Sequence, residues 1–381
     1  MKRKILIGVI SFLGIIVLLQ LVGLLLVRLG IPVYYIQSDG EGIRLVRSTA
    51  EHQTFPTLQP GNVPSLREDA TPFIIDTDMA GDDWMAILYL LQRPDVNVIA
   101  MTVTGAGEAH CGPGIRNALD LLMLAGRPEV PVSCGRESPL LGDHSFPIEW
   151  RNAVDGLFGL SLPQNPNQPP NESAPELISR LLHESDQEVH IVALGPLTNI
   201  AETFEADISL NNNLKILTIM GGAVNVPGNV GPTLNIENQY AEWNIYADPH
   251  AAKVVFDIVS PITLVPLDAT QHAPVTMDFY KRMENDRHTP AAEFVHRILT
   301  QLENSIQQGG YYFWDPLAAA IATDESLTKF QEQNLIVIEE DGPNSGRTSI
   351  SDAGKIIRVA VWADQTRFEE TFLDTLNARL P

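Results

Sequence analysis

The chain is poor in cysteine and in basic residues. Of its 381 residues only two are cysteines, Cys111 and Cys134, which excludes a small disulfide scaffold. Lysine and arginine together number 25 against 47 acidic residues, so the formal net charge is −22. This balance argues against nucleic acid or an anionic lipid surface as the main partner. It suits a small neutral ligand and a cation-dependent site, and the spacing of the cysteines leaves open whether they pair.

The amino-terminal end contains one long hydrophobic run. Residues 5–27 carry no charge, and these 23 residues are enough to cross a bilayer with some tilt. Lys2, Arg3 and Lys4 precede the run, which favours a cytoplasmic amino terminus and an exported remainder. A cleaved signal peptide is the alternative, but its hydrophobic region is normally shorter and no A-x-A site follows. We therefore predict a single-pass membrane anchor over residues 1–29.

The segment after the anchor differs in composition from the rest of the chain. Residues 30–70 are polar and are broken by Pro56, Pro60 and Pro64, so they predict a linker. From residue 71 to residue 381, apolar β-branched runs alternate with helix-like segments, which predicts one α/β domain with a mostly parallel central sheet flanked by helices. We expect strands at 71–75, 96–104, 130–133, 188–194, 214–220 and 262–266, helices at 84–91, 115–124 and 175–183, a polar loop at 162–174, and an edge hairpin within 335–358.

Four aspartates lie close together directly after the first of these strands. Asp76, Asp78, Asp82 and Asp83 belong to the sequence DTDMAGDD, where the strand ends and a helix begins. This is a usual ligand position in open α/β sheets. Two carboxylates about 5 Å apart repel by roughly 3 kcal/mol at an effective dielectric near 20, so a bound divalent metal is the economical arrangement. The alternative is helix capping by Asp82 or Asp83, which leaves the other two acids unexplained.

Five motifs in a fixed order make the chain similar to a known family. They are DTDMAGDD, ALGPLTNIA (193–201), MGG (220–222), AEWNIYADPHAA (241–252) and WDPLAAA (314–320). Together they resemble the inosine–uridine-preferring nucleoside hydrolases, from about residue 72 to near the carboxyl terminus. The resemblance implies hydrolysis of the N-glycosidic bond of ribonucleosides to ribose and free base.

The resemblance also implies a tightly held Ca²⁺ and its ligands. Asp78, Asp83 and Asp315 would ligate the metal together with the main-chain carbonyl of Leu194. Mixed carboxylate and carbonyl oxygens at a roomy site suit Ca²⁺ better than Mg²⁺.

The same resemblance assigns the catalytic and sugar-binding residues. Asp78 would also be the general base that takes a proton from the attacking water. Asp76 is expected to orient the other acids, and Asn199 to cap a helix. Glu242 and Asn244 alternate in AEWNI, so we expect them on one face of an extended segment. The residues that would hold the ribose hydroxyls are Asp82, Asn229, Glu242 and Asn244, although Asn229 has an ordinary turn position as its alternative.

The chain departs from the family pattern at the leaving group. Trp314 stands where many members have a histidine that protonates the departing base, and an indole N–H is too weakly acidic for that task. The purine-specific branch of the family also has tryptophan there and stacks it on the base, which favours purines. Trp150 is a candidate for the second face of the stack, with a buried packing role as its alternative.

Two further departures concern the loops beside the acids. The family often has an asparagine or aspartate after the second strand, and the aligned position falls near Ala106, so we expect its contact to be lost or to pass to Glu108 or His110. The aspartate turn reads Met79-Ala80-Gly81, in which Gly81 is expected to supply backbone freedom.

These observations predict a membrane-anchored, calcium-dependent ribonucleoside hydrolase that leans toward purines and acts outside the cytoplasm. Its partner would be a small nucleoside, and the family resemblance implies a dimer or a tetramer. One alternative is a DxD-type metal-dependent phosphohydrolase with Asp76 as nucleophile and Mg²⁺ bound. Another is a non-catalytic nucleoside- or sugar-binding protein.

Overall fold

The computed structural model describes residues 34–39, 42–47, 57–61 and 65–379, in two compact units, Met1–Thr54 and Phe55–Pro381. In the first unit β1 (Tyr34–Asp39) pairs with β2 (Gly42–Arg47) in an antiparallel hairpin. The predicted anchor, 1–29, lies outside the described residues. Within the described residues, no helix combines the length and the apolar character that crossing a bilayer requires.

The segment predicted as a linker, 30–70, contains this hairpin and also a part that belongs to the second unit. The N–H of Gly61 donates to the carbonyl of Leu124 over 2.8 Å, and the N–H of Arg67 donates to the carbonyl of Pro94 over 2.8 Å. The domain boundaries of the sequence analysis stay a prediction.

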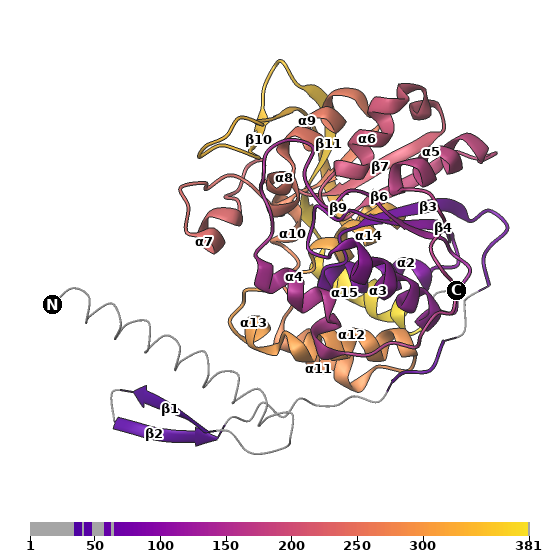
Figure 1. Cartoon of the computed structure of the whole chain (residues 1–381). Helices are drawn as coiled ribbons and strands as arrows, with labels where there is room; N and C mark the ends of the chain where they lie inside the picture. Colours follow the sequence, from indigo (N-terminus) through magenta and orange to yellow (C-terminus); the bar gives the residue numbers. More distant parts are fainter. Residues whose placement is uncertain (1–33, 40–41, 48–56, 62–64, 380–381) are drawn as a thin grey trace, which may run out of the picture. The chain divides into compact units, whose positions relative to one another are not determined.

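The second unit is built on a nine-stranded sheet with the order β10-β9-β11-β8-β7-β6-β3-β4-β5. The strands from β11 to β5 run parallel to one another, and β9 is antiparallel to both β10 and β11. The α/β class with a mostly parallel sheet is thus confirmed (Figure 1). The strands are β3 (Thr71–Thr77), β4 (Val96–Val103), β5 (Val132–Cys134), β6 (Val189–Ala193), β7 (Leu214–Met220), β8 (Ile262–Val265), β9 (Thr328–Val337), β10 (Thr348–Ile350) and β11 (Lys355–Ala363).

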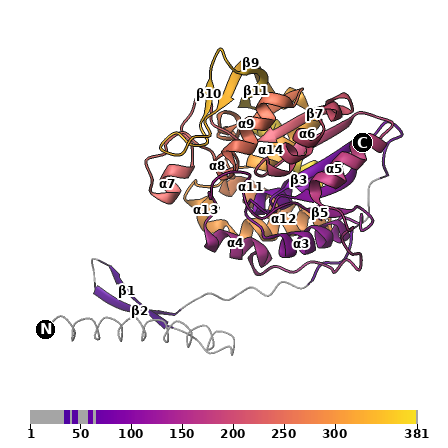
Figure 2. The same cartoon turned by 45° about the horizontal axis from the view of Figure 1, so that its top comes forward.

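Helices cover both faces of this sheet. Figure 2 shows α5, α6 and α9 on one face, with α3 and α12 on the other. The α-helices are α2 (Gly81–Leu91), α3 (Cys111–Leu124), α4 (Ile148–Asp155), α5 (Ala174–Glu184), α6 (Thr198–Ala206), α7 (Val230–Leu234), α8 (Trp243–Ala247), α9 (Pro249–Ile258), α10 (Leu267–Thr270), α11 (Met277–Asn285), α12 (Pro290–Gln301), α13 (Glu303–Gln307), α14 (Trp314–Thr323) and α15 (Gln365–Leu376). Short 3₁₀ turns occupy Leu157–Gly159, Ile208–Asn212 and Glu325–Leu327.

Alternation along the buried strands divides the core into two layers. In β3, Phe73 and Ile75 pack in one apolar cluster with α2, α12 and α14, whereas Ile74 packs in the other with α5, α6 and α9. Successive side chains of a strand point to opposite faces, and a parallel sheet covered by helices buries both faces. This is why residues 72–75 of β3 are continuously apolar and show no alternation with polar residues.

Most predicted elements are present with small shifts of their ends. β7 has the predicted bounds, and the polar loop at 162–174 precedes α5 as expected. The helix predicted at 115–124 begins at Cys111, four residues earlier. The predicted edge hairpin exists as β9 and β10, but the run after it, β11, lies inside the sheet between β9 and β8.

The chain changes direction across the sheet at β3. β4 and β5 follow on one side of β3, whereas β6, β7 and β8 follow on the other side. In open α/β sheets such a reversal leaves a crevice at the carboxyl ends of the strands, where ligands bind. The acidic sequence after β3 therefore lies at this crevice.

Candidate active site

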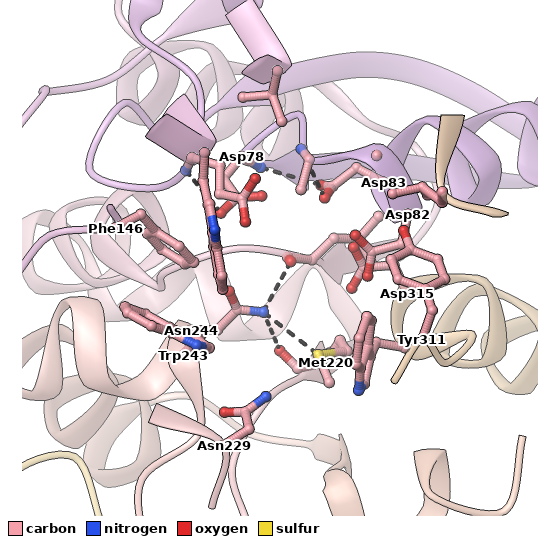
Figure 3. Close-up of a pocket in the computed structure, with 18 of the residues that line it drawn as sticks. Asp78, Asp82, Asp83, Phe146, Met220, Asn229, Trp243, Asn244, Tyr311 and Asp315 are labelled. Carbon is pink, nitrogen blue, oxygen red and sulfur yellow. Dashed lines mark hydrogen bonds between the residues drawn. The ribbon is translucent and has the colours of Figure 1, made fainter. Parts of the chain in front are cut away.

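One cavity of about 480 Å³ lies at the carboxyl ends of β3, β6 and β7. It brings together every residue that the sequence analysis placed in the site, although these residues come from segments far apart in the chain (Figure 3). The roles assigned to the individual residues stay predictions. The predicted site residues that line it are Asp78, Asp82, Asp83, Glu108, Leu194, Asn229, Glu242, Asn244, Trp314 and Asp315.

The turn from β3 into α2 contains its strained residue at an unexpected position. Met79 is fully buried and has a φ of 61°, in the left-handed region that favours glycine. Gly81 was expected to supply the backbone freedom, and that expectation was wrong, because its φ is not among the positive values. A Cβ on Gly81 would lie 2.7 Å from the Phe158 ring, so glycine is needed there for space.

The Asp83 carboxylate stabilises this turn through hydrogen bonds. It accepts hydrogen bonds from the Thr77 hydroxyl, from the N–H of Asp78 over 3.2 Å and from the N–H of Ala80 over 3.1 Å. The bond to Ala80, the residue before α2, satisfies an N–H at the helix start. The capping alternative is therefore confirmed for Asp83, but the same carboxylate also faces the cavity.

Three carboxylates meet where α2 and α14 begin. Asp82, Asp83 and Asp315 each offer an oxygen within 4.8 Å of the others, because α14 packs against α2. Asp83 and Asp315 were both predicted as metal ligands, whereas Asp82 was assigned to the sugar. Asp78, the third predicted carboxylate ligand, is not part of this group. Oδ1 of Asp315 is buried and has no hydrogen-bond partner.

Burial, and then repulsion between neighbouring carboxylates, raises the pKa values of these acids. Burial and the charge of Asp78 raise the pKa of Asp82 to about 7, and burial and the charge of Asp82 raise the pKa of Asp83 to about 7. Burial raises the pKa of Asp78 and of Asp315 well above the usual value, and neighbouring aspartates add to both shifts. An all-oxygen donor set with excess negative charge and an unpaired carboxylate oxygen fits a hard divalent cation.

Asp76 lies beneath the site. Its Oδ1 accepts hydrogen bonds from the Thr102 hydroxyl over 2.6 Å and from Nδ2 of Asn199 over 2.7 Å, and burial raises its pKa to about 7. Asn199 was expected to cap a helix, but it lies within α6 and its amide binds Asp76, so that expectation was wrong. Asp76 does not line the cavity, which disfavours the alternative in which it is a phosphohydrolase nucleophile.

The loop after β4 presents Glu108 to the cavity. Ala106, where the missing family contact was placed, is buried and does not line the cavity, whereas Glu108 does line it. Burial raises the pKa of Glu108 well above its usual value, the charges of Asp78 and Asp82 add to the rise, and Arg151 opposes it. His110, the other candidate, instead contacts Asp155 through Nδ1 over 2.7 Å.

Glu242 and Asn244 reach the cavity from a helix start, and the expected extended segment is wrong. Glu242 caps α8 by accepting the N–H groups of Asn244 and Ile245, and it also accepts the N–H of Gly222. Nδ2 of Asn244 donates to the carbonyls of Leu194 over 3.0 Å and Met220 over 3.2 Å (Figure 3). Asn244 therefore joins the ends of β6 and β7, and Glu242 joins the start of α8 to the segment after β7.

Asn229 occupies a turn and also lines the cavity, so both positions expected from the sequence apply to it. It precedes α7, in the turn position that was the alternative, and its side chain lines the cavity. Oδ1 of Asn229 is buried and has no hydrogen-bond partner, so it is available to a ligand hydroxyl.

Aromatic side chains form the remaining walls. Trp314 lies edge-to-face with Tyr311. Across the cavity from Tyr311, Trp243 stacks on Phe146 with ring centroids 4.9 Å apart (Figure 3). The ring centroids of Trp150 and Trp243 lie 5.4 Å apart, and Trp150 is 37% exposed. The alternative in which Trp150 is a buried packing residue is therefore wrong. Sequence reasoning missed Phe146, Trp243 and Phe158; only the position of Trp243 within AEWNI signalled it.

The Cys111–Cys134 disulfide settles the open question of pairing. It joins the start of α3 to the end of β5, beside the loop that presents Glu108.

The charged side chains that line the cavity are all acidic. No lysine, arginine or histidine lines it in the part of the chain that the structure describes.

Comparisons with known proteins agree with this geometry. A family model described as inosine-uridine preferring nucleoside hydrolase matches residues 73–370. The chain is 31% identical over 303 residues to an Arabidopsis thaliana protein named probable uridine nucleosidase 2, which covers 78% of this chain and 91% of that protein. It is 38% identical over 278 residues to uridine nucleosidase 1 of the same plant, covering 72% and 80%.

A solved structure gives the same result for the fold. The purine-preferring ribonucleoside hydrolase from Gardnerella vaginalis superposes with a TM-score of 0.70 at 28% identity, covering 82% of this chain and all of that chain. The chain therefore belongs to the inosine-uridine preferring nucleoside hydrolase family and is a hydrolase acting on N-glycosyl bonds.

Proposed function

We propose that the protein is a calcium-dependent ribonucleoside hydrolase whose pocket favours purine nucleosides, and that residues 5–27 tether it to a membrane with the domain outside the cytoplasm. Family membership supplies the reaction, hydrolysis of the N-glycosidic bond of ribonucleosides. The metal, the base preference and the location are the parts proposed here.

One observation carries the proposal: a single cavity is acidic at one end and aromatic at the other. A volume of about 480 Å³ falls in the usual range for small-molecule sites. A nucleoside has the same division, with a hydroxyl-rich sugar joined to a flat heterocycle. Carboxylates and amides can accept from and donate to the sugar hydroxyls, and aromatic rings can stack on the base.

The acidic end supplies the sugar contacts and the charge for the reaction. Asn229 has a buried Oδ1 without a hydrogen-bond partner, and Asp82 and Glu242 also line the cavity. Cleavage of a glycosidic bond develops positive charge on the sugar, and fixed carboxylates stabilise such an oxocarbenium-like centre. The negative cavity wall therefore favours the transition state over the neutral substrate.

The metal would be held by Asp83 and Asp315, with Asp78 or Asp82 and the Leu194 carbonyl completing the oxygen set. When bound, a divalent cation lowers the pKa of a nearby water and orients it. Leu194 already accepts from Asn244, but a carbonyl oxygen has a second lone pair for a further contact. Carboxylates combined with a main-chain carbonyl favour Ca²⁺ over Mg²⁺.

Asp78 is suited to act as the general base. Without a cation, burial and the charge of Asp83 raise the pKa of Asp78 well above its usual value, and a bound cation would keep the carboxylate ionised so that it can accept a proton. Oδ2 of Asp78 is held by the N–H of Glu108 over 3.1 Å, so the carboxylate has a defined orientation when it takes the proton from water.

The base would lie between the aromatic walls. Trp314 and Tyr311 form one side, and Trp150, Trp243 and Phe146 form the other. Stacking on aromatic side chains contributes about 1–3 kcal/mol per base in nucleic-acid complexes, and a purine offers the larger surface. Two relatives are named uridine nucleosidases, after a pyrimidine nucleoside, so the base preference of this protein is tested by direct measurement.

A substrate panel tests this proposal. We expect release of base from inosine, adenosine and guanosine with higher kcat/KM than from uridine and cytidine, loss of activity with a chelator, and recovery with Ca²⁺. Asp78→Ala is expected to abolish base release, which would also exclude a merely ligand-binding protein. Faster hydrolysis of p-nitrophenyl phosphate than of any nucleoside would contradict the proposal.

The location and assembly are separate parts of the proposal. The Cys111–Cys134 disulfide supports export, because disulfides persist in oxidising compartments. We expect the activity in the membrane fraction, and we expect protease added to the outside of intact cells to remove it. Activity confined to the cytosolic fraction would contradict this. The family resemblance supports a dimer or tetramer, which light scattering of the detergent-solubilised protein measures.

A further inference from the structure

The loop of residues 105–110, here the Glu108 loop, is pressed against Asp78. The N–H of Glu108 donates to Oδ2 of Asp78 over 3.1 Å, and the N–H of Ala109 donates to the carbonyl of Asp78 over 2.9 Å. A Cβ on Gly107 would lie 2.1 Å from the Cβ of Asp78, so only glycine allows this approach. The position of the loop therefore sets the orientation of Asp78 as well as that of Glu108.

Arg151 in α4 holds this loop from behind. Its Nη2 donates to the carbonyl of Gly105 over 2.9 Å and to that of Ala109 over 3.4 Å, and its Nε donates to the carbonyl of Glu108 over 3.3 Å. A guanidinium is planar and presents its donors as a rigid fork, so three bonds to one loop fix its path.

The end of α4 adds a second attachment. Asp155 accepts from the N–H of His110 over 3.0 Å and contacts Nδ1 of the same residue over 2.7 Å. Trp150 and Ala153 of α4 line the cavity. One short helix thus contributes to the aromatic wall and also holds the loop of the acidic wall.

We propose that Arg151 is a positioning residue for the hydrolysis of nucleosides, which holds the Glu108 loop so that Asp78 and Glu108 face the sugar. This inference rests on the proposed sugar-binding role of the acidic end. The loop has no strand or helix of its own between β4 and α3, so its path depends on such contacts. Misplacement of a catalytic group by about 1 Å can cost about 10²-fold in rate.

The charge of Arg151 also matters, because no basic side chain lines the cavity among the described residues. Its guanidinium is close enough to Glu108 to counter part of the negative charge around it. Lysine at this position keeps the charge but loses the fork, whereas glutamine keeps a donor but loses the charge. Comparing these substitutions separates the two contributions.

The test measures kcat, KM and Tm, on the full chain with Ca²⁺, for Arg151→Lys, Arg151→Gln and Arg151→Met. We expect Arg151→Met to lower kcat/KM for inosine by about 10- to 100-fold, with a smaller loss for Arg151→Lys. Arg127→Met is the matched control, because Arg127 also donates to a main-chain carbonyl, that of Val98, and does not line the cavity. It should keep the kinetic constants of the wild type.

A double-mutant cycle with Glu108→Gln distinguishes positioning from general stabilisation. If Arg151 acts through the loop, Glu108→Gln should cost much less when Arg151 is already methionine or, should that variant not fold, lysine. Fully additive effects, or kinetic constants within twofold of the wild type for Arg151→Met, would overturn the proposal. If the wild-type enzyme released no base from any nucleoside, the proposed function itself would have failed.

Discussion

The main-chain N–H of Glu108 donates a hydrogen bond to Oδ2 of Asp78 over 3.1 Å. This contact joins the loop after β4 to the turn after β3, the two neighbouring strands on one side of the reversal in the sheet. It orients the proposed general base without using a second side chain.

Substitution of Gly107 by alanine should displace Asp78. The added Cβ would overlap the Asp78 side chain, and Asp78 is buried and cannot move away freely. We expect kcat/KM for inosine to fall by about 100-fold or more. Gly112→Ala in α3 is the matched control, because a Cβ there meets no atom within 4 Å. Equal kinetic constants for the two variants would contradict this view of the loop.

Removal of a carboxylate from the acidic cluster should weaken metal binding. In the wild type, added Ca²⁺ should raise Tm, because a ligand that binds only the folded state stabilises it. Asp315→Asn should reduce this rise strongly, whereas Asp324→Asn, just past the end of α14, should not. Thermal unfolding with and without Ca²⁺ measures both. An unchanged rise in Asp315→Asn would remove Asp315 from the metal site.

The stability of the metal-free protein should fall as the pH rises. The pKa values of Asp76, Asp82 and Asp83 are raised from 3.8 to about 7 in the folded state, chiefly by burial. Between these values the folded state binds more protons than the unfolded state, so the free energy of unfolding decreases with pH. We expect the Tm of the metal-free protein to decline from pH 4 to pH 8 and Ca²⁺ to reduce that decline. A Tm that rises over this range without metal would contradict the raised pKa values.

Loss of the indole at position 314 should affect purine nucleosides most. Trp314→Ala removes one stacking surface, and about 1–3 kcal/mol corresponds to a rise in KM of roughly 5- to 150-fold for inosine. The effect on uridine should be smaller. Trp362→Ala on β11 is a control outside the cavity and should leave both KM values unchanged. A KM for inosine within twofold of the wild type would exclude stacking on Trp314.

Reduction of the disulfide should destabilise the fold. The bond closes a loop with a sequence separation of 23 residues, for which the entropic effect is roughly 3 kcal/mol. Urea unfolding with and without reducing agent measures this difference. The double variant Cys111→Ser, Cys134→Ser should be insensitive to the reducing agent. Identical unfolding midpoints for the oxidised and reduced wild type would show that the bond adds no stability.

Much of the acidic end could be predicted from residue order. Asp78, Asp82 and Asp83 are neighbours in the chain, and a strand followed by a helix places them at one edge of the sheet. Asp315 could be added only through the resemblance of its motif. By contrast, nothing in the sequence indicated the left-handed backbone conformation of Met79, because the local composition favoured Gly81 for that conformation.

The aromatic end and the supports of the site could not be predicted in the same way. Phe146 and Trp150 come from a loop and a short helix whose path no periodic pattern determines. The bonds from Asn199 to Asp76 and from Arg151 to the Glu108 loop join residues that only folding brings together.

By itself, the sequence determined the layered α/β architecture and the concentration of acids at the end of β3, because alternating apolar runs and adjacent aspartates act over a few residues. Only the tertiary structure decided which side chains face those acids, that Glu108 and not Ala106 lines the cavity, and that the two cysteines pair. Such choices depend on the paths of loops across the carboxyl edge of the sheet, and these paths follow from packing between distant segments.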